Sequence, residues 1–378
     1  LQRTDKTPRY LRSNLPDPAT TKVAFITTFV PGSEPLSMLA QTLKAMTHAE
    51  FPHDTWVLDE GNDPKVQNLC RNLGVKYFSR SGIEKYNTVG GTFSVKTKGG
   101  NHNAWYDAHG LQYDFVAQID TDFFPRKDFL TKTLVKFADP NVAWVGTPQI
   151  YKNTESFLAR GAAEQTYGFY GPIMNGLSKV ESTMLIGANH IIRVEALRRA
   201  GLYYAHLTED LATGMTLHSQ GWKSVYVAEP LAEGEGPTTW TAYFKQQFRW
   251  AKGSIDLQFT QLFKLTRTMP FFQKLLYSWM LLFYWNGAAY GAGIVLLLLY
   301  FGFGWSAANA DPLPFFASYL PLLLIMEIGV LWTQQFNVRP KQERGLYLRA
   351  RLMLIACMPV YLAAFMSAIR DLGKHTAF

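Results

Sequence analysis

Two polar clusters in residues 207–253 carry the side chains best suited to chemistry. The first is Thr208, Glu209 and Asp210, and the second is the segment Q-Q-F-R-W at residues 246–250. A carboxylate of the first cluster can take a proton from a hydroxyl group. The second cluster offers a cation for phosphate oxygens and an indole ring on which a C–H face can stack. Both lie between an α/β-patterned part of the chain and a strongly apolar tail.

The acidic cluster begins a helical pattern, and two interpretations of it stay open. Thr208 suits a helix N-cap, and acids in a first turn suit the helix dipole, so a structural role explains these residue types. A functional role makes Asp210 the general base that deprotonates an acceptor hydroxyl, with Glu209 beside it. The spacing does not decide between the two.

The second cluster lies in a helical pattern in which Gln246 and Arg249 share a face. Arg249 can clamp a diphosphate through paired hydrogen bonds, and Trp250 can lie beneath a sugar ring. The alternative is an amphipathic helix whose arginine extends its charged head into water just before the apolar tail.

Asp120 and Asp122 follow a short apolar run at residues 115–119 that predicts a buried strand. Two carboxylates spaced i, i+2 at a strand end can converge on one hard divalent cation, which a nucleotide diphosphate needs as charge grows on the leaving group. A turn aspartate followed by a helix-capping aspartate is the structural alternative.

Two further residues are candidates for contact with a nucleotide. Asp59 ends the apolar run at residues 55–58 and can accept a hydrogen bond from a base or ribose, although the segment D-E-G-N-D is equally typical of a turn. Lys98 precedes two glycines and can approach a phosphate; a loop lysine in water is the alternative.

Short apolar runs alternate with segments of helical spacing, and this alternation predicts the fold. We expect strands at residues 23–29, 55–58, 75–78, 115–119 and 142–146, and helices at residues 34–46, 64–73 and 99–109. The pattern is typical of an α/β domain with a mostly parallel sheet. Ligand sites in such sheets lie at the carboxyl ends of the strands, where Asp59 and Asp120 fall.

The C-terminal part is far more apolar than the rest. Nearly uncharged runs at about residues 275–305 and 313–333 are each long enough to span a bilayer. The loop after them is rich in arginine, so the positive-inside rule places it in the cytosol. Basic residues flank a third apolar segment on both sides and Pro359 interrupts it, which favours an interfacial helix at about residues 345–369 over a third crossing.

The chain therefore divides into three parts. We expect an entry linker at residues 1–20, the α/β domain at residues 21–265 and a membrane region at residues 266–378. The first residue is Leu1 rather than a methionine, so we expect further residues to precede it in the gene product.

The composition excludes several classes of protein. The 378 residues have a formal net charge of +8, which suits anionic lipids or a phosphorylated substrate. There is no Lys/Arg-rich run or nucleic-acid-binding motif, so we expect no nucleic-acid partner. The only two cysteines, Cys70 and Cys357, are too far apart in sequence to suggest a disulfide framework or a zinc site. Glycine-rich phosphate-binding signatures are absent, which leaves carboxylates and a metal to hold a nucleotide.

Seven motifs, taken in order, resemble the processive family-2 glycosyltransferases, namely bacterial cellulose synthase and, more distantly, hyaluronan and chitin synthases. They are I-T-T-F at residues 26–29 with Glu34, L-D-E-G at 58–61, T-K-G-G-N at 97–101, D-T-D at 120–122, L-I-G-A-N at 185–189, T-E-D at 208–210 and Q-Q-F-R-W at 246–250. The resemblance covers about residues 23–378. It implies a cytosolic GT-A (Rossmann-like) glycosyltransferase domain followed by transmembrane and interfacial α-helices that build a channel.

The resemblance also implies a role for each matching residue. By resemblance, uridine would be bound by Thr28, Glu34 and Asp59, and the diphosphate with its Mg²⁺ or Mn²⁺ by Lys98, Asp120 and Asp122. Catalysis would take place at the turn of Thr208, Glu209 and Asp210, with Asp210 as base. The pyrophosphate and terminal sugar would contact Gln246, Arg249 and Trp250, and Gly187 would line the acceptor site.

Departures from the family pattern leave the reaction class unchanged but put the polymer in doubt. Ala212 stands where cellulose synthases often have histidine, and Glu60 stands where a second aspartate is usual. The loop at residues 29–33 is longer than the family's turn, and residues 185–189 lack its cysteine. The T-E-D triplet favours a glucan over hyaluronan.

The sequence therefore predicts a membrane-embedded, processive, inverting β-glycosyltransferase (a hexosyltransferase) that elongates a polysaccharide from a UDP-sugar and passes it through its own channel. We expect UDP-glucose as donor and a β-glucan, cellulose-like or β-1,3-linked, as product. The expected partners are the growing polysaccharide, the bilayer of the inner or plasma membrane and accessory secretion subunits. A non-processive transferase to a lipid acceptor and a catalytically inert membrane scaffold are the alternatives.

Overall fold

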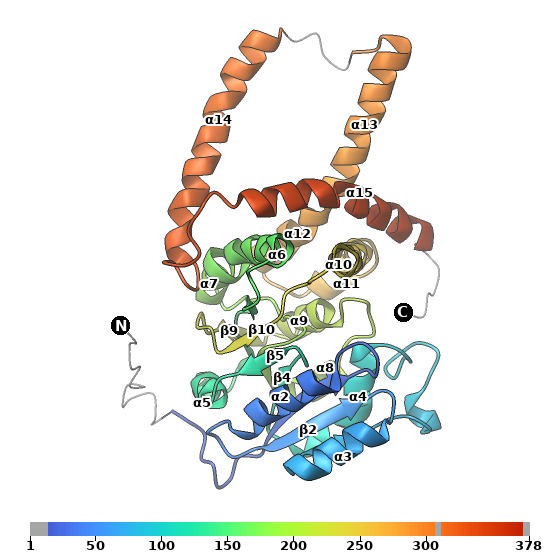
Figure 1. The fold of residues 1–378 in the computed structure, drawn as a ribbon, viewed down its shortest axis with the longest axis vertical. Helices are drawn as coiled ribbons and strands as arrows, with labels where there is room; N and C mark the ends of the chain where they lie inside the picture. The colour runs from blue at the N-terminus through green and yellow to red at the C-terminus, as the bar shows by residue number, and fades with distance from the viewer. Residues whose placement is uncertain (1–13, 307–310, 373–378) are drawn as a thin grey trace.

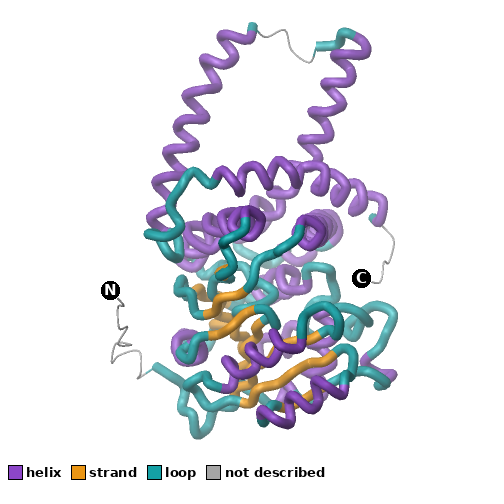
Figure 2. Tube along the Cα trace, in the orientation of Figure 1, coloured by secondary structure: helices purple, strands orange, loops and turns teal. Residues whose placement is uncertain are grey.

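Strands and long apolar helices occupy different parts of the molecule. A computed structural model describes residues 14–306 and 311–372, so most of the expected entry linker lies outside the described residues. Figure 1 shows the strand-bearing part at one end and two long helices, α13 and α14, at the other. Figure 2 shows the strands confined to the first part, with only helices and loops in the second.

The central sheet has seven strands in the order β3-β2-β1-β4-β8-β6-β9. They are β1 (Val23–Phe29), β2 (Asp54–Asp59), β3 (Lys76–Phe78), β4 (Phe115–Ile119), β6 (Val142–Gly146), β8 (His190–Arg193) and β9 (Lys223–Tyr226). The five predicted strands are confirmed. Neighbours are parallel except at β8, which runs antiparallel to both β4 and β6. Sequence reasoning missed the short strands β8 and β9.

A second sheet of three short strands continues directly from the D-T-D segment. It comprises β5 (Phe123–Pro125), β7 (Ile150–Tyr151) and β10 (Ala232–Gly234), in the order β5-β10-β7. The backbone N–H of Glu235 donates to the carbonyl of Asp122 at 3.1 Å. This small sheet thereby fixes the backbone of Asp122 from the side opposite the central sheet.

The helices of the strand-bearing part follow the predicted alternation. They are α2 (Leu36–Thr47), α3 (Pro64–Leu73), α4 (Lys98–Ala108), α5 (Phe129–Leu134), α8 (Val194–Ala200) and α9 (Glu209–Ser219), with the 3-10 turns η1 (Glu84–Tyr86), η2 (Gly110–Gln112) and η3 (Val135–Ala138). Helix α3 shows why the boundaries were readable: the Asp63 side chain accepts from the Lys65 N–H, Pro64 occupies the first turn, and Gly74 ends the helix in the left-handed conformation.

The core lies on both faces of the central sheet, as an α/β fold requires. Alternate residues of β1 point to opposite faces: Phe25 and Phe29 belong to one buried cluster, and Ala24 and Ile26 to another. The first cluster includes apolar residues of α2, and the second includes Trp105 of α4. A strand buried on both faces explains the unbroken apolar run that predicted it.

The remaining helices build the apolar part of the molecule. They are α6 (Phe157–Gly168), the π-helical turn η4 (Phe169–Ile173), α7 (Met174–Lys179), α10 (Trp240–Thr260), α11 (Leu262–Thr266), α12 (Phe271–Leu281), η5 (Leu282–Trp285), α13 (Asn286–Phe303), α14 (Pro312–Thr333), η6 (Gln334–Phe336) and α15 (Leu348–Asp371). Within residues 14–306 and 311–372, three stretches are long and apolar enough to cross a membrane, namely Phe271–Phe303, Pro312–Phe336 and Leu348–Asp371. The first is the predicted span at 275–305, divided by η5 into α12 and α13.

Helix α15 differs from the other two candidates in its direction. In Figure 1, α13 and α14 rise away from the body, whereas α15 lies across their base and packs against α6, α10 and α13. Polar contacts tie it down: the Tyr361 hydroxyl donates to Gln247 at 2.8 Å, and Lys252 pairs with Asp371 at 2.8 Å. Such a course is compatible with the predicted interfacial helix, which remains a prediction because no membrane is present.

Candidate active site

Several of the predicted residues lie where three parallel strands end. Phe29 of β1 pairs with Asp59 of β2, and Thr27 pairs with Ile119 of β4. Asp120 follows Ile119 directly, so it stands beside the end of β1. The antiparallel strand β8 starts at the same edge, and the loop before it brings Gly187 there.

The middle residue of the D-T-D segment determines where the two acids point. The hydroxyl of buried Thr121 donates to the Thr28 carbonyl, and the Thr42 hydroxyl donates to the Thr121 carbonyl at 2.5 Å. Thr121 is thus held inward between β1 and α2. The segment is a tight turn, closed by the Phe123 N–H donating to the Asp120 carbonyl at 3.0 Å, and Asp120 and Asp122 on either side of Thr121 stay partly exposed.

Three carboxylates at this edge repel one another. Burial, followed by the charge of Asp120, raises the pKa of Asp122 to about 7, and Glu34 acts in the same direction. Burial and Asp120 also raise the pKa of Glu34. Three acids therefore lie close enough to oppose one another's ionisation, an arrangement that a bound cation would favour.

Lys98 is the first residue of α4 and forms an ion pair with Asp120. Its ammonium also donates to the Gly187 carbonyl at 2.7 Å. Burial works against the charge of Lys98, but Asp120, Glu209 and Asp210 outweigh it and raise the lysine pKa. The alternative of a loop lysine in water is therefore wrong: Lys98 is a cation held between two groups of acids.

The T-E-D segment forms the start of α9, but not in the way that simple helix capping predicts. Thr208 occupies the N-cap position, yet its hydroxyl makes no capping bond to the helix. Burial, then Asp210, raises the pKa of Glu209 to about 7. Burial also raises the pKa of Asp210, while the Leu211 N–H, Lys98 and Arg249 work against the shift. A carboxylate with a raised pKa suits a general base.

Gly187 connects the two groups of acids. A Cβ at this position would lie 3.2 Å from Oδ2 of Asp210 and 3.8 Å from Nζ of Lys98. Any side chain here would crowd the carboxylate and fill the space beside it. The Gly187 carbonyl accepts from Lys98 and also from Nε2 of Gln118, at 2.5 Å, so both sides of this loop are fixed.

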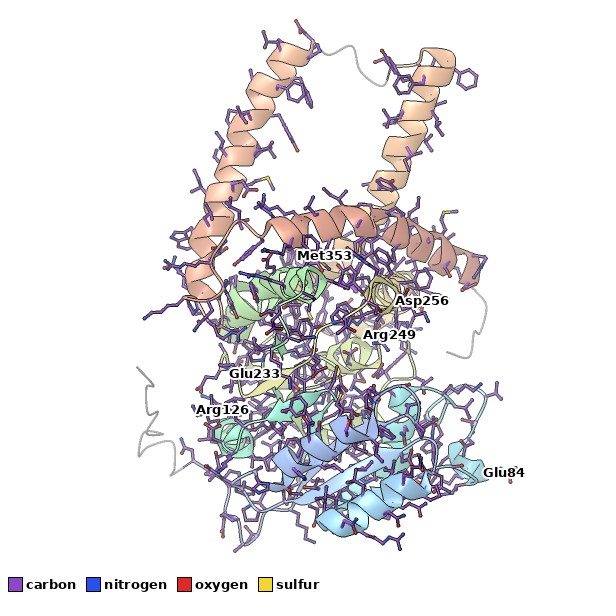
Figure 3. The ribbon with its side chains drawn as sticks, in the orientation of Figure 1. Glu84, Arg126, Glu233, Arg249, Asp256 and Met353 are labelled. Carbon is purple, nitrogen blue, oxygen red and sulfur yellow. The ribbon has the colours of Figure 1, made fainter. Side chains whose placement is uncertain are left out.

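Helix α10 brings the Q-Q-F-R-W segment to the same place. Gln246, Arg249, Trp250 and Gly253 recur at helical spacing on one face. At Gly253 the helix approaches the acidic turn closely, since a Cβ there would lie 2.5 Å from Cγ2 of Thr208. The charge of Arg249 lowers the pKa of both Glu209 and Asp210, so this exposed guanidinium, labelled in Figure 3, acts on the acids. The Arg249 side chain is exposed, and its contact with a diphosphate stays a prediction.

Asp59 is placed differently from the other acids. Its carboxylate is fully buried and accepts from the Gly61 N–H at 2.9 Å, the Asp63 N–H at 2.6 Å and the Tyr77 hydroxyl at 2.8 Å. The turn interpretation of this residue therefore holds. The structure does not bring Asp59 into contact with Lys98, Asp120 or Asp210.

Sequence reasoning missed several residues that shape the site. Tyr151 lies in a two-residue strand without any pattern; burial and then Asp122 raise its pKa to about 12, and a hydrogen bond with Gln246 opposes this. Arg80 is buried, pairs with Glu60 and donates to four backbone carbonyls of the loop that leads to Lys98. Gln118 could have been noticed as the one polar residue of an apolar run.

Asp120 and Asp122 fit a metal ion whose other ligands are substrate phosphates and waters. Among the described residues, no three His, Cys, Asp or Glu side chains are grouped to hold an ion. Asp120 and Asp122 alone are sufficient for Mg²⁺ or a similar ion, because such ions are commonly bound through one or two carboxylates plus substrate phosphates and waters. The raised pKa of Asp122 is the observation that agrees with such a site.

Comparison with known proteins gives a consistent result. The family model described as Glycosyl transferase family group 2 matches residues 115–366. The UDP-forming catalytic subunit of cellulose synthase from Pseudomonas fluorescens (strain SBW25) is 27% identical over 331 residues, which are 84% of this chain and 42% of that protein. Its counterpart in Komagataeibacter sucrofermentans is 27% identical over 270 residues, 68% of this chain and 33% of that protein. The chain thus spans less than half the length of these relatives.

A solved structure shares the fold. Mannosyltransferase PcManGT from Pyrobaculum calidifontis, in complex with GDP-Man and Mn²⁺, superposes with a TM-score of 0.54 at 15% identity, over 92% of this chain and 93% of that one. At this identity the likeness concerns the fold alone. The predicted α/β fold of the GT-A type is confirmed.

Proposed function

The chain belongs to glycosyl transferase family group 2, and from this premise we propose that it elongates a polysaccharide from a UDP-sugar as a membrane-embedded, processive, inverting β-glycosyltransferase. UDP-glucose is the proposed donor, and a β-glucan, led through a channel of membrane helices, the proposed product. One observation carries the proposal: Lys98 links Asp120 at the strand end to Gly187 beside Asp210, a carboxylate whose pKa the charge of Arg249 on α10 also affects. Similarity to the catalytic subunits of cellulose synthases supports it.

Asp210 is the proposed catalytic base. It takes the proton of the acceptor hydroxyl while that oxygen attacks the anomeric carbon, the bond from that carbon to the diphosphate oxygen breaks, and UDP leaves with the electron pair. Attack opposite the leaving group inverts the anomeric centre. The raised pKa of Asp210 and the glycine at position 187, where a Cβ would lie 3.2 Å from Oδ2 of Asp210, support this role.

The leaving diphosphate meets two cations in this proposal. Lys98 and Arg249 hold its oxygens, Arg249 through paired hydrogen bonds. Asp120 and Asp122 would hold Mg²⁺ or Mn²⁺, which when bound neutralises charge on the diphosphate. Lys98 would then exchange Asp120 for a phosphate oxygen, a change that its long side chain permits.

The remaining predicted residues receive the donor and the acceptor. Thr28, Glu34 and Asp59 form the proposed uridine site. Asp59 is fully buried and already accepts three hydrogen bonds, so a base would have to displace one of these donors to reach it. Gln246 and Trp250 are the proposed contacts for the terminal sugar on the acceptor side.

The proposed membrane arrangement follows the directions of the helices. Residues 21–265 form a cytosolic catalytic domain, residues 266–378 the membrane region of the cell membrane, and α13 and α14 span it while α15 lies at the interface. Nitroxide labels at Leu352→Cys and Met366→Cys test this, since 14 positions correspond to about 21 Å along a helix. Equal depths for the two labels support an interfacial α15, and depths that differ by most of that length exclude it.

A radiolabelled donor assay tests the proposed function. Membranes that hold the full chain should convert UDP-glucose with a divalent metal into a polymer, and Asp210→Asn should lower the rate about 10³-fold, within the range for a lost general base. Short organic-extractable products would instead indicate a lipid acceptor and no polymerisation. Binding of UDP without turnover in the wild type would indicate an inert scaffold. UDP-GlcNAc and UDP-glucuronate, assayed in parallel, determine the donor.

A further inference from the structure

A buried histidine–aspartate pair lies behind the acidic turn. Nε2 of His206 lies 2.8 Å from Oδ2 of Asp256, and Nδ1 lies 3.1 Å from the backbone N of Thr208. Because the Thr208 N–H donates to Nδ1, the ring proton of the neutral imidazole is on Nε2 and is donated to Asp256. The Thr208 hydroxyl lies 3.0 Å from Nδ1 as well. All three residues are buried.

These contacts replace the usual helix cap. An N-cap threonine normally accepts a bond from a later N–H of its own helix, but the Thr208 side chain makes none. Its backbone and hydroxyl are held by His206 instead. The start of α9, which carries Asp210, is therefore fixed from outside the helix.

The partner on the other side is the helix that carries Arg249. Asp256 follows Arg249 by seven residues, two helical turns, so both lie on one side of α10 with Gly253 between them. Figure 3 labels Arg249 and Asp256 on this helix. Gly253 lets α10 approach Thr208, as its close contact requires. A second bond joins the same two segments, from the Tyr204 hydroxyl to Oε1 of Gln261 at 2.7 Å.

We propose that His206 and Asp256 are positioning residues for the transfer reaction, which set the distance between the base Asp210 and the diphosphate-binding Arg249. This inference rests on the proposed function. Neither residue touches a reacting atom in it. The helix between Arg249 and Asp256 is a rigid spacer of about 10 Å. The imidazole, bonded to Asp256 at one end and to Thr208 at the other, fixes the position of the Thr208 turn relative to Arg249.

The experiment compares substitutions that keep or remove single bonds, in membranes that hold the full chain. Asp256→Leu leaves Nε2 without an acceptor, whereas Asp256→Asn keeps an acceptor oxygen. We expect kcat to fall about 100-fold in Asp256→Leu, the scale of a small misplacement of a reacting group. In Asp256→Asn it should stay within about tenfold of the wild type. KM for the donor and the Kd for UDP should change little, because Arg249 and Lys98 remain in place.

Two variants of His206 keep the inference testable if Asp256→Leu fails to fold. His206→Asn retains an acceptor near the Nδ1 position and loses the bond to Asp256; His206→Gln retains a donor near the Nε2 position and loses the bond to Thr208. Both should lower kcat without raising the donor KM. A wild-type kcat in both variants overturns the proposal.

His218→Gln is the matched control at the other end of α9. His218 is also buried, with Nδ1 2.7 Å from the Tyr277 hydroxyl and Nε2 3.0 Å from the Ser224 hydroxyl. It should lower the melting temperature in detergent but leave kcat per folded molecule unchanged. If it lowers kcat as much as Asp256→Leu does, the effect is structural and the proposal is overturned.

The proposed function can fail separately. If Asp210→Asn turns over as fast as the wild type, Asp210 is not the base. The His206–Asp256 pair then has no base to position. Lost turnover in Asp210→Asn with normal kcat in the His206 and Asp256 variants refutes the positioning role alone.

Discussion

The turns after β2 and β4 start from the same pattern, a buried strand followed by an acid, and yet they are built in opposite ways. Asp59 turns inward and receives three hydrogen bonds from its own neighbourhood. Asp120 and Asp122 turn outward, and Asp122 has a pKa raised to about 7. The acid of the first turn is satisfied by hydrogen bonds from its surroundings, whereas burial and neighbouring acids oppose the ionisation of Asp122 in the second.

The residue that follows the first acid of each turn accounts for much of this difference. After β2, Glu60 pairs with buried Arg80 through two hydrogen bonds of 2.9 and 2.6 Å, so the turn is bound to the loop before Lys98. After β4, Thr121 is the buried residue that is held by β1 and α2, and the acids on either side of it stay partly exposed. The contacts of the neighbouring residues thus decide whether an acid at a strand end stabilises its own turn or can bind a ligand.

The largest effect should come from the unsatisfied turn. Asp122→Asn removes one of the two proposed metal ligands, and turnover should fall at least about 100-fold, since a catalytic metal supplies several kcal/mol. The melting temperature of the metal-free protein at pH 8 should rise, because a carboxylate with a raised pKa opposes folding when it ionises. Turnover assays and melting curves check this, and a lower melting temperature would show that Asp122 stabilises the fold.

Substitutions in the turn after β2 should affect the folding free energy more than turnover. Glu60→Ala leaves the Arg80 guanidinium buried with only backbone acceptors, which should cost about 3 kcal/mol of folding free energy. The control is Glu195→Gln, which breaks an exposed pair with Arg199 on α8 and should cost about 0.5 kcal/mol. Thermal melts in detergent measure both, and equal losses would mean that burial of Arg80 is unimportant.

A smaller loss is expected for the acid of the same turn. Asp59→Asn replaces one accepting oxygen by an NH₂ group that faces hydrogen-bond donors. This should lower the folding free energy by about 2 kcal/mol. Because the donor can still bind at Lys98 and Arg249, turnover per folded molecule should fall far less than in Asp122→Asn. A loss as large as that of Asp122→Asn would assign Asp59 to catalysis and remove the contrast between the two turns.

The smallest effect concerns the dependence of stability on pH. The folded-state pKa of Glu209 is raised to about 7 by burial and Asp210, above its ordinary 4.5. Its contribution to stability is therefore complete below that ordinary value and is lost as the pH rises through 7. The melting temperature of the substrate-free protein should fall between pH 5 and pH 8, and less steeply in Glu209→Gln. An unchanged slope would place Glu209 in water.

Much of the architecture follows from local patterns. The apolar runs of β1, β2 and β4, the helix signals around Pro64 and Gly74, and the apolar length of α13 and α14 are properties of neighbouring residues. Distant acids at strand ends also converge predictably, because parallel strands share an edge. These features explain why the fold could be expected, whereas the grouping of Lys98 and Asp210 with Asp120 was expected from the resemblance of the ordered motifs.

The sequence by itself therefore determined the α/β alternation, the apolar helices and the residue types of the site. Only the tertiary structure decided which acid is an anchor, that β8 runs antiparallel, and that His206 and Asp256, 50 positions apart, hold the acidic turn of α9 against α10. The physical reason is that burial and hydrogen bonding depend on contacts between segments far apart in the chain. The motif around Asp210 identifies a candidate carboxylate in the sequence. The packing of α9, α10 and the Gly187 loop determines the pKa and the position of that carboxylate.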